Sequence, residues 1–353
     1  MLKITSALDL KDLVTFIPNK HEPIHNWYHY KEGYSKQFVE LMLKKFNIQK
    51  NQTVLDPFCG VGTTPLTCKQ NGIKSIGFDV SPLAAFVSRV KTADYDLTEL
   101  NKTCRNVLME KFQRPEHLPR DEWLRKVFNR YVLEDIMFYK EKIFQIQDEK
   151  IMHFMLLGLM DSAMECSYAY KDGALIRIQK KHVPPLKKYF KYKIKKMLKD
   201  LEKANVPNTE CKIELGDARD LAVCDNGVDF IITSPPYLNK IEYTKIYRTE
   251  YALFFEQPKT QVRSFIEEGE DAYFRDMRKC LENFKRVCKG PMAIVIGGGC
   301  FPDHVTLVDE KIGEIAEDIG LKVKEILVAR NSWCTKARTV KVGQIRESVV
   351  ILE

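Results

Sequence analysis

A strand–turn–helix–strand pattern between residues 52 and 82 constrains the fold of this chain more than any other feature. The segment reads QTVLDPFCGVGTTPLTCKQNGIKSIGFDVSP, with a short buried strand at 54–55, a helix over 64–71 and a second strand over 75–78. The helix stops at Asn71-Gly72, a common C-terminal signal. Because a helix that links two strands in this way joins parallel strands, the pattern predicts an α/β fold with a mostly parallel sheet.

The rest of the chain predicts that a long insertion interrupts this sheet. Residues 97–205 carry amphipathic runs such as EDIMFYKEKIFQI, which indicate helices. Strand patterns return in CKIELGDARD, GVDFIITSPPY and GPMAIVIGGG. The closing pair, LKVKEILVA and ESVVILE separated by a polar loop, favours an antiparallel edge strand. We therefore expect an N-terminal segment and the first half of the α/β domain in 1–96, a helical, basic insertion in 97–205, and the second half of the domain in 206–353.

Length and composition are those of a globular protein with a sizeable core. The chain has 353 residues and a net charge of +8, which weakly favours an anionic partner. Its ten cysteines include no C-x-x-C pair and no Cys/His cluster with zinc spacing, so we expect buried thiols in a reducing compartment and no metal. There is no signal-peptide core and no run of ~18–20 apolar residues, so a cytoplasmic location without membrane contact is expected.

The glycine turn DPFCGVGTT, residues 56–64, is the first candidate binding site. Asp56 ends a strand, and Gly60 and Gly62 let the backbone approach a ligand closely before the helix begins. A carboxylate and a helix N-terminus at the carboxyl end of a strand suit a nucleoside cofactor. The turn lacks the G-K-[ST] ending of a phosphate-binding loop and the full G-x-G-x-x-G pattern. A plain glycine-rich connection is the structural alternative.

Two further aspartates follow the next two predicted strands. Asp79, in GFDVSP, lies about twenty positions beyond the glycine turn, where an acidic residue can accept both ribose hydroxyls of a nucleoside. Its alternative role is to cap the following helix. Asp217, in LGDARD, can receive the exocyclic amine of an adenine ring, and its alternative is an ordinary turn aspartate.

The segment TSPPYLNK, residues 233–240, is the second candidate site. Prolines cannot donate to a sheet ladder, so the apolar strand before them should end there. The hydroxyl of Ser234 and the carbonyl of Pro235 are then neighbouring acceptors that can hold an N–H₂ group. Tyr237 can stack on the flat ring that bears the amine. The alternative is a rigid Pro-Pro turn.

The order DPFCGVGTT, GFDVSP, LGDARD, TSPPY resembles that of the S-adenosylmethionine-dependent methyltransferases that modify exocyclic amines of DNA bases. In this family S-P-P-Y is typical of the cytosine-N4 enzymes of restriction–modification systems, whereas adenine-N6 enzymes more often carry D-P-P-Y. The upstream HNWYHYKEGYSKQFVELML and the final RESVVILE are also similar to family segments. The likeness covers residues 21–90 and 211–353 and implies a Rossmann-like methyltransferase fold.

The resemblance implies a role for each matched residue. S-adenosylmethionine is expected around the glycine turn, with Asp79 at its ribose, Val80 beside its adenine and Asp217 at the adenine amine. The implied cofactor residues are Tyr30, Asp56, Pro57, Phe58, Cys59, Gly60, Gly62, Thr63, Thr64, Asp79, Val80, Ser81, Asp217 and Ala218. The implied catalytic residues, which hold a flipped-out base during direct displacement, are Ser234, Pro235, Pro236 and Tyr237.

The implied substrate is N4 of cytosine in double-stranded DNA. N6 of adenine in DNA and N2 of guanine in RNA are the alternatives that the same fold allows. The chain contains no Pro-Cys pair, so the covalent route of cytosine-C5 enzymes is not expected. We call residues 234–237 the clamp. The tyrosine-rich IEYTKIYRTEYALFF that follows it either lines the base pocket or packs as an ordinary helix.

A basic stretch in the insertion is the candidate DNA contact. RIQKKHVPPLKKYFKYKIKKMLK carries ten Lys and Arg, and no acidic residue lies between Asp172 and Asp200. Such a run can neutralise several phosphates, and its alternative is a solvated lysine face on a helix. The hairpin-like KDGALIRIQKKHVPP is a candidate groove-facing segment. The expected DNA-binding residues are Arg177, Lys180, Lys181, Lys187 and Lys188. The resemblance also allows a cognate restriction endonuclease as a partner.

Overall fold

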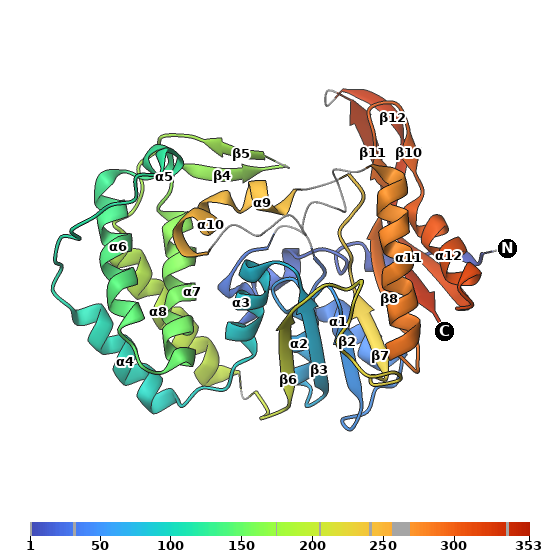
Figure 1. Cartoon of the computed structure of the whole chain (residues 1–353), viewed down its shortest axis with the longest axis horizontal. Helices are drawn as coiled ribbons and strands as arrows, with labels where there is room; N and C mark the ends of the chain where they lie inside the picture. Colours follow the sequence, from blue (N-terminus) through green and yellow to red (C-terminus); the bar gives the residue numbers. More distant parts are fainter. Residues whose placement is uncertain are drawn as a thin grey trace.

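The structure is a computed structural model that describes residues 2–30, 33–173, 175–204, 206–239, 242–255, 269–336 and 339–353. Within these ranges the central sheet contains β1 (Ile4–Ser6), β2 (Thr53–Asp56), β3 (Lys74–Asp79), β6 (Cys211–Leu215), β7 (Phe230–Thr233), β8 (Met292–Gly297), β11 (Val323–Lys336) and β12 (Val340–Leu352). Their spatial order is β1-β11-β12-β8-β7-β2-β3-β6 (Figure 1). Neighbours pair parallel except at β12, which is antiparallel to β8 and β11. The expected Rossmann-like, mostly parallel sheet with antiparallel pairing toward one edge is confirmed.

The strand order reverses at the junction between β2 and β7. From β2 the chain continues outward to β3 and β6, whereas β7 and β8 lie on the other side of β2. Leu55 of β2 pairs with Ile231 of β7, so the two strands run side by side in the same direction. In open α/β sheets, ligands bind outside the carboxyl ends of the strands at such a reversal. The residues that follow Asp56 and Thr233 therefore occupy the position of a ligand site.

Alternate residues of the central strands enter two different apolar cores, one on each face of the sheet. Leu55 and Ile231 pack in the same core as helices α11 (Glu270–Val287) and α12 (Val308–Asp318), whereas Val54 and Ile232 pack with α1 (Lys36–Lys45). Short 3₁₀ turns lie between β1 and α1 at Leu8–Leu10, Ile17–Lys20 and His25–Trp27. The alternation follows from the two-residue period of strands that are covered on both faces.

The glycine turn after β2 leads into α2 (Thr63–Gln70), and β3 leads into α3 (Pro82–Thr92). Gly62 precedes α2 with a φ of 82°, and a Cβ atom there would lie 2.4 Å from the Oγ of Ser88 on α3. Glycine fits because it adopts positive φ and has no side chain to collide with that hydroxyl. The Oγ of Ser81 caps α3 by accepting a hydrogen bond from the N–H of Ala84. The turn is thereby held tightly against its neighbouring helix.

Residues 97–203 form a helical body beside the sheet (Figure 1). Its elements are α4 (Leu97–Met109), α5 (Glu122–Val127), α6 (Arg130–Phe144), α7 (Glu149–Glu165), the antiparallel hairpin of β4 (Ala169–Asp172) and β5 (Leu175–Ile178), and α8 (Leu186–Lys203). Helices α9 (Tyr243–Ile246) and α10 (Arg248–Phe254) pack in the same apolar core. Trp27, Tyr30 and Leu83 from the first part of the chain also belong to that core. The helical body is therefore continuous with the sheet domain. Ile241, at the start of the tyrosine-rich stretch, lies outside the described residues.

Within the described ranges, no helix combines the length and the apolar character that a membrane span requires.

The prediction of a polar loop between the two closing strands is wrong for most of that stretch. β11 and β12 stay paired from Val323 opposite Leu352 to Lys336 opposite Val340, so the expected loop is largely a two-stranded ribbon. Trp333 in this ribbon is 49% exposed. Residues 331–333, 335, 340 and 341 of the ribbon are exposed. Because so few of its side chains are buried, this part needs no apolar alternation, and the periodicity that identifies a strand is missing.

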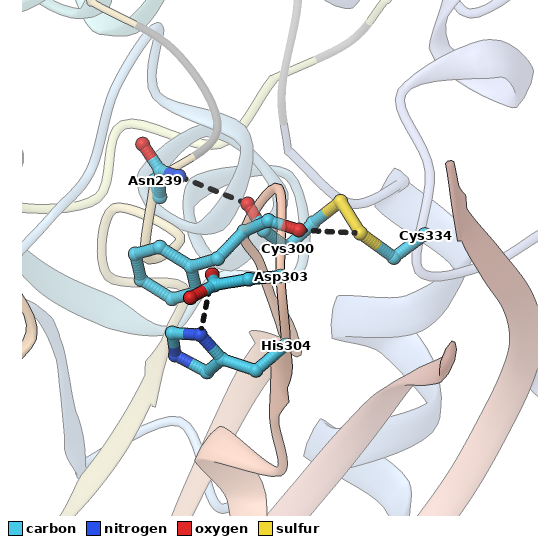
Figure 2. The surroundings of a disulfide bond; sticks show 6 residues. Asn239, Cys300, Asp303, His304 and Cys334 are labelled. Atoms are coloured by element: carbon cyan, nitrogen blue, oxygen red, sulfur yellow. Dashed lines mark hydrogen bonds and ion pairs between the residues drawn. A yellow bond between two sulfur atoms is a disulfide. The ribbon is translucent and has the colours of Figure 1, made fainter. Parts of the chain in front are cut away.

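The expectation that the cysteines are free thiols is wrong for one pair. Cys300 of the short strand β9 (Gly299–Cys300) and Cys334 of β11 form a disulfide, with their Cα atoms 5.4 Å apart (Figure 2). β9 pairs with β10 (Val305–Thr306), and the side-chain amide of Asn239, close to the clamp, donates to the Cys300 carbonyl at 2.9 Å. The two cysteines are 34 residues apart in sequence. Their spacing therefore carries no local signal, and the fold alone brings them together.

We predict that the unreduced, denatured protein contains eight titratable thiols and that reduction raises the number to ten, because eight of the cysteines are free and two are bonded. Thiol titration with and without a reductant measures both values. A Cys334→Ser variant is the matched control and should show nine thiols under either condition. Ten thiols without reduction in the unsubstituted protein would contradict the pairing.

Candidate active site

One open cavity, with about 1050 Å³ of empty space, lies at the carboxyl ends of β2, β3, β6 and β7. Its wall is made by the glycine turn after β2, the end of β3, residues 216–218 after β6, and residues 234–237 after β7. The glycine turn and the TSPPY segment, which are far apart in the sequence, thus open into the same space. This is the strand reversal at which a ligand site is expected.

Most of the predicted site residues line this cavity. Those that do are Tyr30, Asp56, Pro57, Phe58, Cys59, Gly60, Thr63, Asp79, Val80, Ser81, Asp217, Ala218, Ser234, Pro235, Pro236 and Tyr237. Gly62 and Thr64 are not part of the wall. Gly62 faces Ser88 of α3, and the buried hydroxyl of Thr64 bonds to the hydroxyl of Tyr34. Both residues therefore shape the turn from behind.

The carboxylate of Asp56 ties the two halves of the site together. Its Oδ1 accepts hydrogen bonds from the hydroxyl of Thr233 at 2.6 Å and from the backbone N–H of Phe58 at 3.2 Å. Its Oδ2 accepts a bond from the hydroxyl of Tyr34 at 2.9 Å. Burial raises the pKa of Asp56 to about 6, although these donors favour the ionised form. Asp56 thus links the end of β2 to the end of β7, and much of its acceptor capacity is used inside the protein.

The carboxylate of Asp79 is fixed by the backbone on both oxygens. Oδ2 accepts from the N–H of Gly60 at 2.9 Å, and Oδ1 accepts from the N–H of Ser81 at 2.8 Å. Burial raises the pKa of Asp79 to about 6. Each carboxylate oxygen has two lone pairs, so both oxygens retain one for a ligand. The orientation suits a pair of neighbouring hydroxyl groups, such as those of a ribose.

Asp217 already has a partner that sequence reasoning missed. The guanidinium of Arg219 donates to both oxygens of Asp217, at 2.6 Å from Nη2 and 3.0 Å from Nε, and also to Asp276 of α11 at 2.7 Å. Burial alone would raise the pKa of Asp217, but the bonds and charge of Arg219 outweigh it and hold that pKa below its usual value. The only sequence signal was an arginine two residues after the aspartate.

The clamp segment begins where β7 ends, at Thr233, as the prolines predicted. Within the described part of the chain, neither the hydroxyl of Ser234 nor the carbonyl of Pro235 has a hydrogen-bond partner. The next carbonyl, that of Pro236, accepts a bond from the hydroxyl of buried Tyr273 at 3.0 Å. The backbone of the clamp is therefore anchored on one side, while the two predicted acceptors keep their lone pairs.

Tyr237 is held from behind by groups that sequence reasoning did not identify. A Cβ atom on Gly297 of β8 would lie 2.5 Å from its ring, so only glycine leaves room for the tyrosine. The hydroxyl of Tyr237 donates to the buried carboxylate of Glu347 at 2.6 Å, and Glu347 pairs with Arg330 at 2.6 Å. The ring is consequently fixed in one orientation on the cavity wall.

Stacked tyrosines form another part of the wall. The ring of Tyr30 lies parallel to those of Tyr243 and Tyr247, with centroids 5.6 Å and 5.1 Å away. Tyr30 and Tyr243 line the cavity, whereas Tyr247 supports them. The tyrosine-rich stretch after the clamp thus both lines the pocket and packs as a helix. Lining residues that were not predicted are Phe16, Gly33, Tyr34, Val61, Gly216 and Tyr243.

The predicted DNA-binding residues lie outside the cavity, on the helical body. Arg177, Lys180, Lys181, Lys187 and Lys188 are exposed, and Arg177 pairs with Asp172 across the hairpin at 2.7 Å. The basic stretch is not wholly a solvated face, because Lys193 is buried and pairs with Asp161 at 2.6 Å. Among the described residues, no group of three or more His, Cys, Asp or Glu side chains is placed to hold a metal ion.

The groups that line the cavity fit a nucleoside cofactor. Asp79 presents fixed acceptors, Gly60 allows a close approach of the backbone, and Tyr30 and Phe58 supply flat apolar surfaces. On the side of β7, the free acceptors of Ser234 and Pro235 can hold an amine. The cavity can therefore bring together a nucleoside and an aromatic amine.

Comparison with known proteins agrees with this geometry. Residues 14–85 match a family model described as DNA methylase. The chain is 29% identical over 287 residues to the Type II methyltransferase M.BsoBI of Geobacillus stearothermophilus, an alignment that covers 69% of this chain and 55% of that protein. The Type II methyltransferase M.AvaI of Nostoc sp. is 27% identical over 303 residues, which cover 71% of this chain and 58% of the relative. The resemblance to DNA amino-methyltransferases is confirmed.

The chain spans a little over half the length of these two curated relatives. Among solved structures, TrmN from Thermus thermophilus aligns with 90% of this chain and 48% of its own, with 10% sequence identity and a TM-score of 0.33.

We predict that Tyr34→Phe and Thr233→Val each lower the free energy of unfolding by about 1.5–3 kcal/mol, because each removes a donor to a buried carboxylate. Chemical denaturation measures the change. The matched control is Tyr131→Phe, a tyrosine that is 76% exposed, and it should leave stability unchanged. Unchanged stability in both the Tyr34 and the Thr233 variant would contradict the role given to Asp56.

Proposed function

We propose that this chain transfers a methyl group from S-adenosylmethionine to the exocyclic N4 of cytosine in double-stranded DNA. The observation that carries this proposal is the junction of β2 and β7, where the glycine turn and the SPPY clamp open into one cavity. A methyl donor held by the glycine turn and an amine held by the clamp would therefore lie next to each other. The DNA methylase match over residues 14–85 supports the same reaction class.

The cofactor residues act by binding and orientation. S-adenosylmethionine supplies an electrophilic methyl group on a sulfonium. Asp79 accepts hydrogen bonds from the ribose hydroxyls. Its two oxygens are held in place by the backbone N–H groups of Gly60 and Ser81. Val80 and Ala218 line the cavity and would contact the adenine, and the Asp217–Arg219 pair would face its amine. Because the carboxylate of Asp217 is shared with Arg219, adenine recognition there uses the remaining lone pairs of Asp217 or the peptide groups beside it.

The clamp residues act on the amine of the target base. An exocyclic amine on a pyrimidine donates its lone pair into the ring and is therefore a weak nucleophile. When Ser234 Oγ and the Pro235 carbonyl accept hydrogen bonds from its two N–H groups, the nitrogen moves toward tetrahedral geometry and its lone pair becomes available. Tyr237 stacks on the base and keeps it in the plane that the two acceptors require. The nitrogen would then attack the sulfonium methyl group directly, so that the N–C bond forms as the C–S bond breaks and the thioether leaves. The methylated nitrogen would lose one proton to solvent, and no covalent bond between enzyme and base would be needed.

The helical body supplies the DNA contacts in this proposal. A base inside a duplex can reach the clamp only if it is flipped out of the stack. Exposed Arg177, Lys180, Lys181, Lys187 and Lys188 then neutralise backbone phosphates around the flipped nucleotide. We therefore propose residues 97–205 as the target-recognition region, with the β4–β5 hairpin toward the groove. A cognate restriction endonuclease and a cytoplasmic location belong to the same proposal.

Adenine-N6 of DNA is the second candidate target, because Ser234 and the Pro235 carbonyl can hold the amine of either base. Serine in place of aspartate at the first clamp position favours cytosine. Guanine-N2 of RNA is the third candidate. Nucleoside analysis of the methylated product separates all three.

We predict that the chain transfers labelled methyl groups to duplex DNA and not to tRNA, and that mass spectrometry of the digested DNA finds N4-methylcytosine. Ser234→Ala should lower kcat by about 100-fold or more, because one of the two hydrogen-bond acceptors for the amine is lost. Tyr237→Ala should lower kcat/KM by about 5- to 150-fold, the worth of stacking one base.

Tyr237→Phe is the control for that stacking, since it keeps the ring and removes the hydroxyl that donates to Glu347. Full transfer by the Tyr237→Ala protein would contradict the stacking role. N6-methyladenine in the digest would replace the cytosine assignment with the second candidate.

We also predict that S-adenosylmethionine binds more weakly as the pH falls below about 6. The pKa of Asp79 is raised to about 6, so the carboxylate is ionised above this pH and is protonated below it. A protonated oxygen can no longer accept a ribose hydroxyl, and the affinity should fall up to about tenfold for each pH unit. Calorimetry between pH 5 and 8 measures the dependence.

The Asp79→Asn variant distinguishes the titration of Asp79 from that of Asp56, whose pKa is also raised to about 6. The asparagine variant should bind weakly at pH 8 and lose the part of the pH dependence that Asp79 contributes. An identical pH profile in the variant and the unsubstituted protein would exclude Asp79 as the titrating ribose acceptor.

A further inference from the structure

A second cavity, with about 920 Å³ of empty space, lies in the helical body, apart from the glycine turn and the clamp. It is lined by residues 114–118 and Arg120 ahead of α5, by Arg125 of α5, and by Arg130 and Glu134 of α6. Four arginines face two glutamates in this wall, which leaves an excess of two positive charges. We refer to it as the arginine cavity. An anion is the ligand that such a wall attracts.

A nearly buried carboxylate holds two of the four arginines in place. The side chain of Glu134 is 5% exposed. Its carboxylate accepts a hydrogen bond from the Nε of Arg130 at 2.9 Å and lies 3.3 Å from the Nε of Arg114. Both contacts use the Nε atoms of the guanidinium groups. The terminal Nη groups of both arginines therefore retain donors for a further ligand. Glu134 thus orients the two side chains and leaves their outer ends available.

The other two arginines have no internal partner. Within the described ranges, the guanidinium groups of Arg120 and Arg125 form no hydrogen bond or ion pair, and both residues are exposed. A planar guanidinium presents paired donors that match two oxygens of a phosphate group. Two unpaired arginines beside two pre-oriented ones form a site with more donors than the protein itself uses.

The arginine cavity adjoins the predicted DNA-contact residues. The Nζ of Lys187 lies 3.5 Å from the carbonyl of Glu110, shortly before the cavity residues begin. The N–H of Tyr168, just before β4, donates to the carbonyl of Val127 at the end of α5 at 2.8 Å. Figure 1 shows α5 grouped with β4 and β5 at the upper edge of the helical body. The cavity therefore extends the same basic surface.

The cavity is also connected to the segment that follows the clamp. The indole N–H of Trp123, on α5, donates to the hydroxyl of Thr249 on α10 at 3.0 Å, and the guanidinium of Arg248 lies 4.7 Å from the centre of the Trp123 ring. Helix α10 comes shortly after the clamp in the chain. An anion bound in the cavity would thus be held in part by α5, the helix that packs against α10.

We propose that the arginine cavity binds a backbone phosphate of the same DNA duplex whose target base enters the clamp. This inference rests on the proposed function for its ligand, but it assigns a different site. A phosphate contact away from the flipped nucleotide fixes the register of the duplex on the protein without reading its sequence. Arg120 and Arg125 supply the free donors, and Arg114 and Arg130 supply the oriented ones.

The experiment is the salt dependence of duplex DNA binding by the Arg120→Gln/Arg125→Gln double variant. Each phosphate contact contributes about 0.9 to the slope of log K against log salt, so the double variant should lose about one unit of slope. At about 0.1 M salt the affinity should fall roughly eightfold for one contact. Fluorescence anisotropy with a duplex that contains the methylated sequence measures both quantities.

The matched control is Lys44→Gln/Lys50→Gln, which removes the same charge from exposed positions in α1 and in the loop before β2. These positions lie on the amino-end side of the sheet, so the control should keep the slope. A scan of the duplex with single uncharged methylphosphonate linkages locates the contact. One linkage outside the target base pair should weaken binding by the unsubstituted protein and leave the arginine variant unaffected.

An unchanged slope in the arginine variant would overturn the proposal, as would equal losses in the two double variants. Binding of inorganic phosphate to Arg120 and Arg125 with an unchanged DNA slope would assign the cavity to a small anion and overturn it as well. If the unsubstituted chain does not bind duplex DNA at all, the proposed function itself fails, so the two failures are distinguishable.

Discussion

The hydrogen bonds of the Asp56 carboxylate hold the functional site together. Thr233 and Tyr34 reach this one group from β7 and from the N-terminal segment, so three parts of the chain meet at a single buried acceptor. The arrangement places a carboxylate in a poorly solvated position, which raises its pKa to about 6. Burial of a charge is tolerated here because the donors compensate for lost water. The distance between the two halves of the cavity is fixed as a result.

The clamp illustrates how a protein leaves selected polar atoms unused. Tyr273 satisfies the carbonyl of Pro236, and Glu347 accepts the hydroxyl of Tyr237. These supporting bonds determine the backbone path and the ring orientation. The acceptors of the two preceding residues, Ser234 and Pro235, line the cavity, have no such partner in the described part of the chain and can hold a ligand without rearrangement. Such pre-organisation lowers the entropic cost of holding a ligand in a reactive position.

The sequence predicted the parts of the structure that depend on local pattern. The strand–turn–helix–strand unit has strong periodicity and a clear glycine turn, and prolines mark the end of β7, so both halves of the site could be located. Partners that only the tertiary fold brings together could not be predicted. Asp276 beside Arg219, Glu347 behind Tyr237, and the Cys300–Cys334 bond all bring together residues that lie far apart in the sequence. The exposed β11–β12 ribbon lacks the apolar alternation by which strands are recognised.

If the helical body recognises the target, as proposed above, its continuity with the sheet domain bears on how such a chain could acquire a new target. Trp27 and Leu83 share an apolar core with the helices of residues 97–203, and Trp27 also donates to Asp200 at the end of α8 at 3.0 Å. A helical body taken from a relative would arrive without matching contacts for these side chains. Changes of specificity by exchange of whole segments would therefore need compensating substitutions along this seam, whereas changes in the exposed hairpin would not.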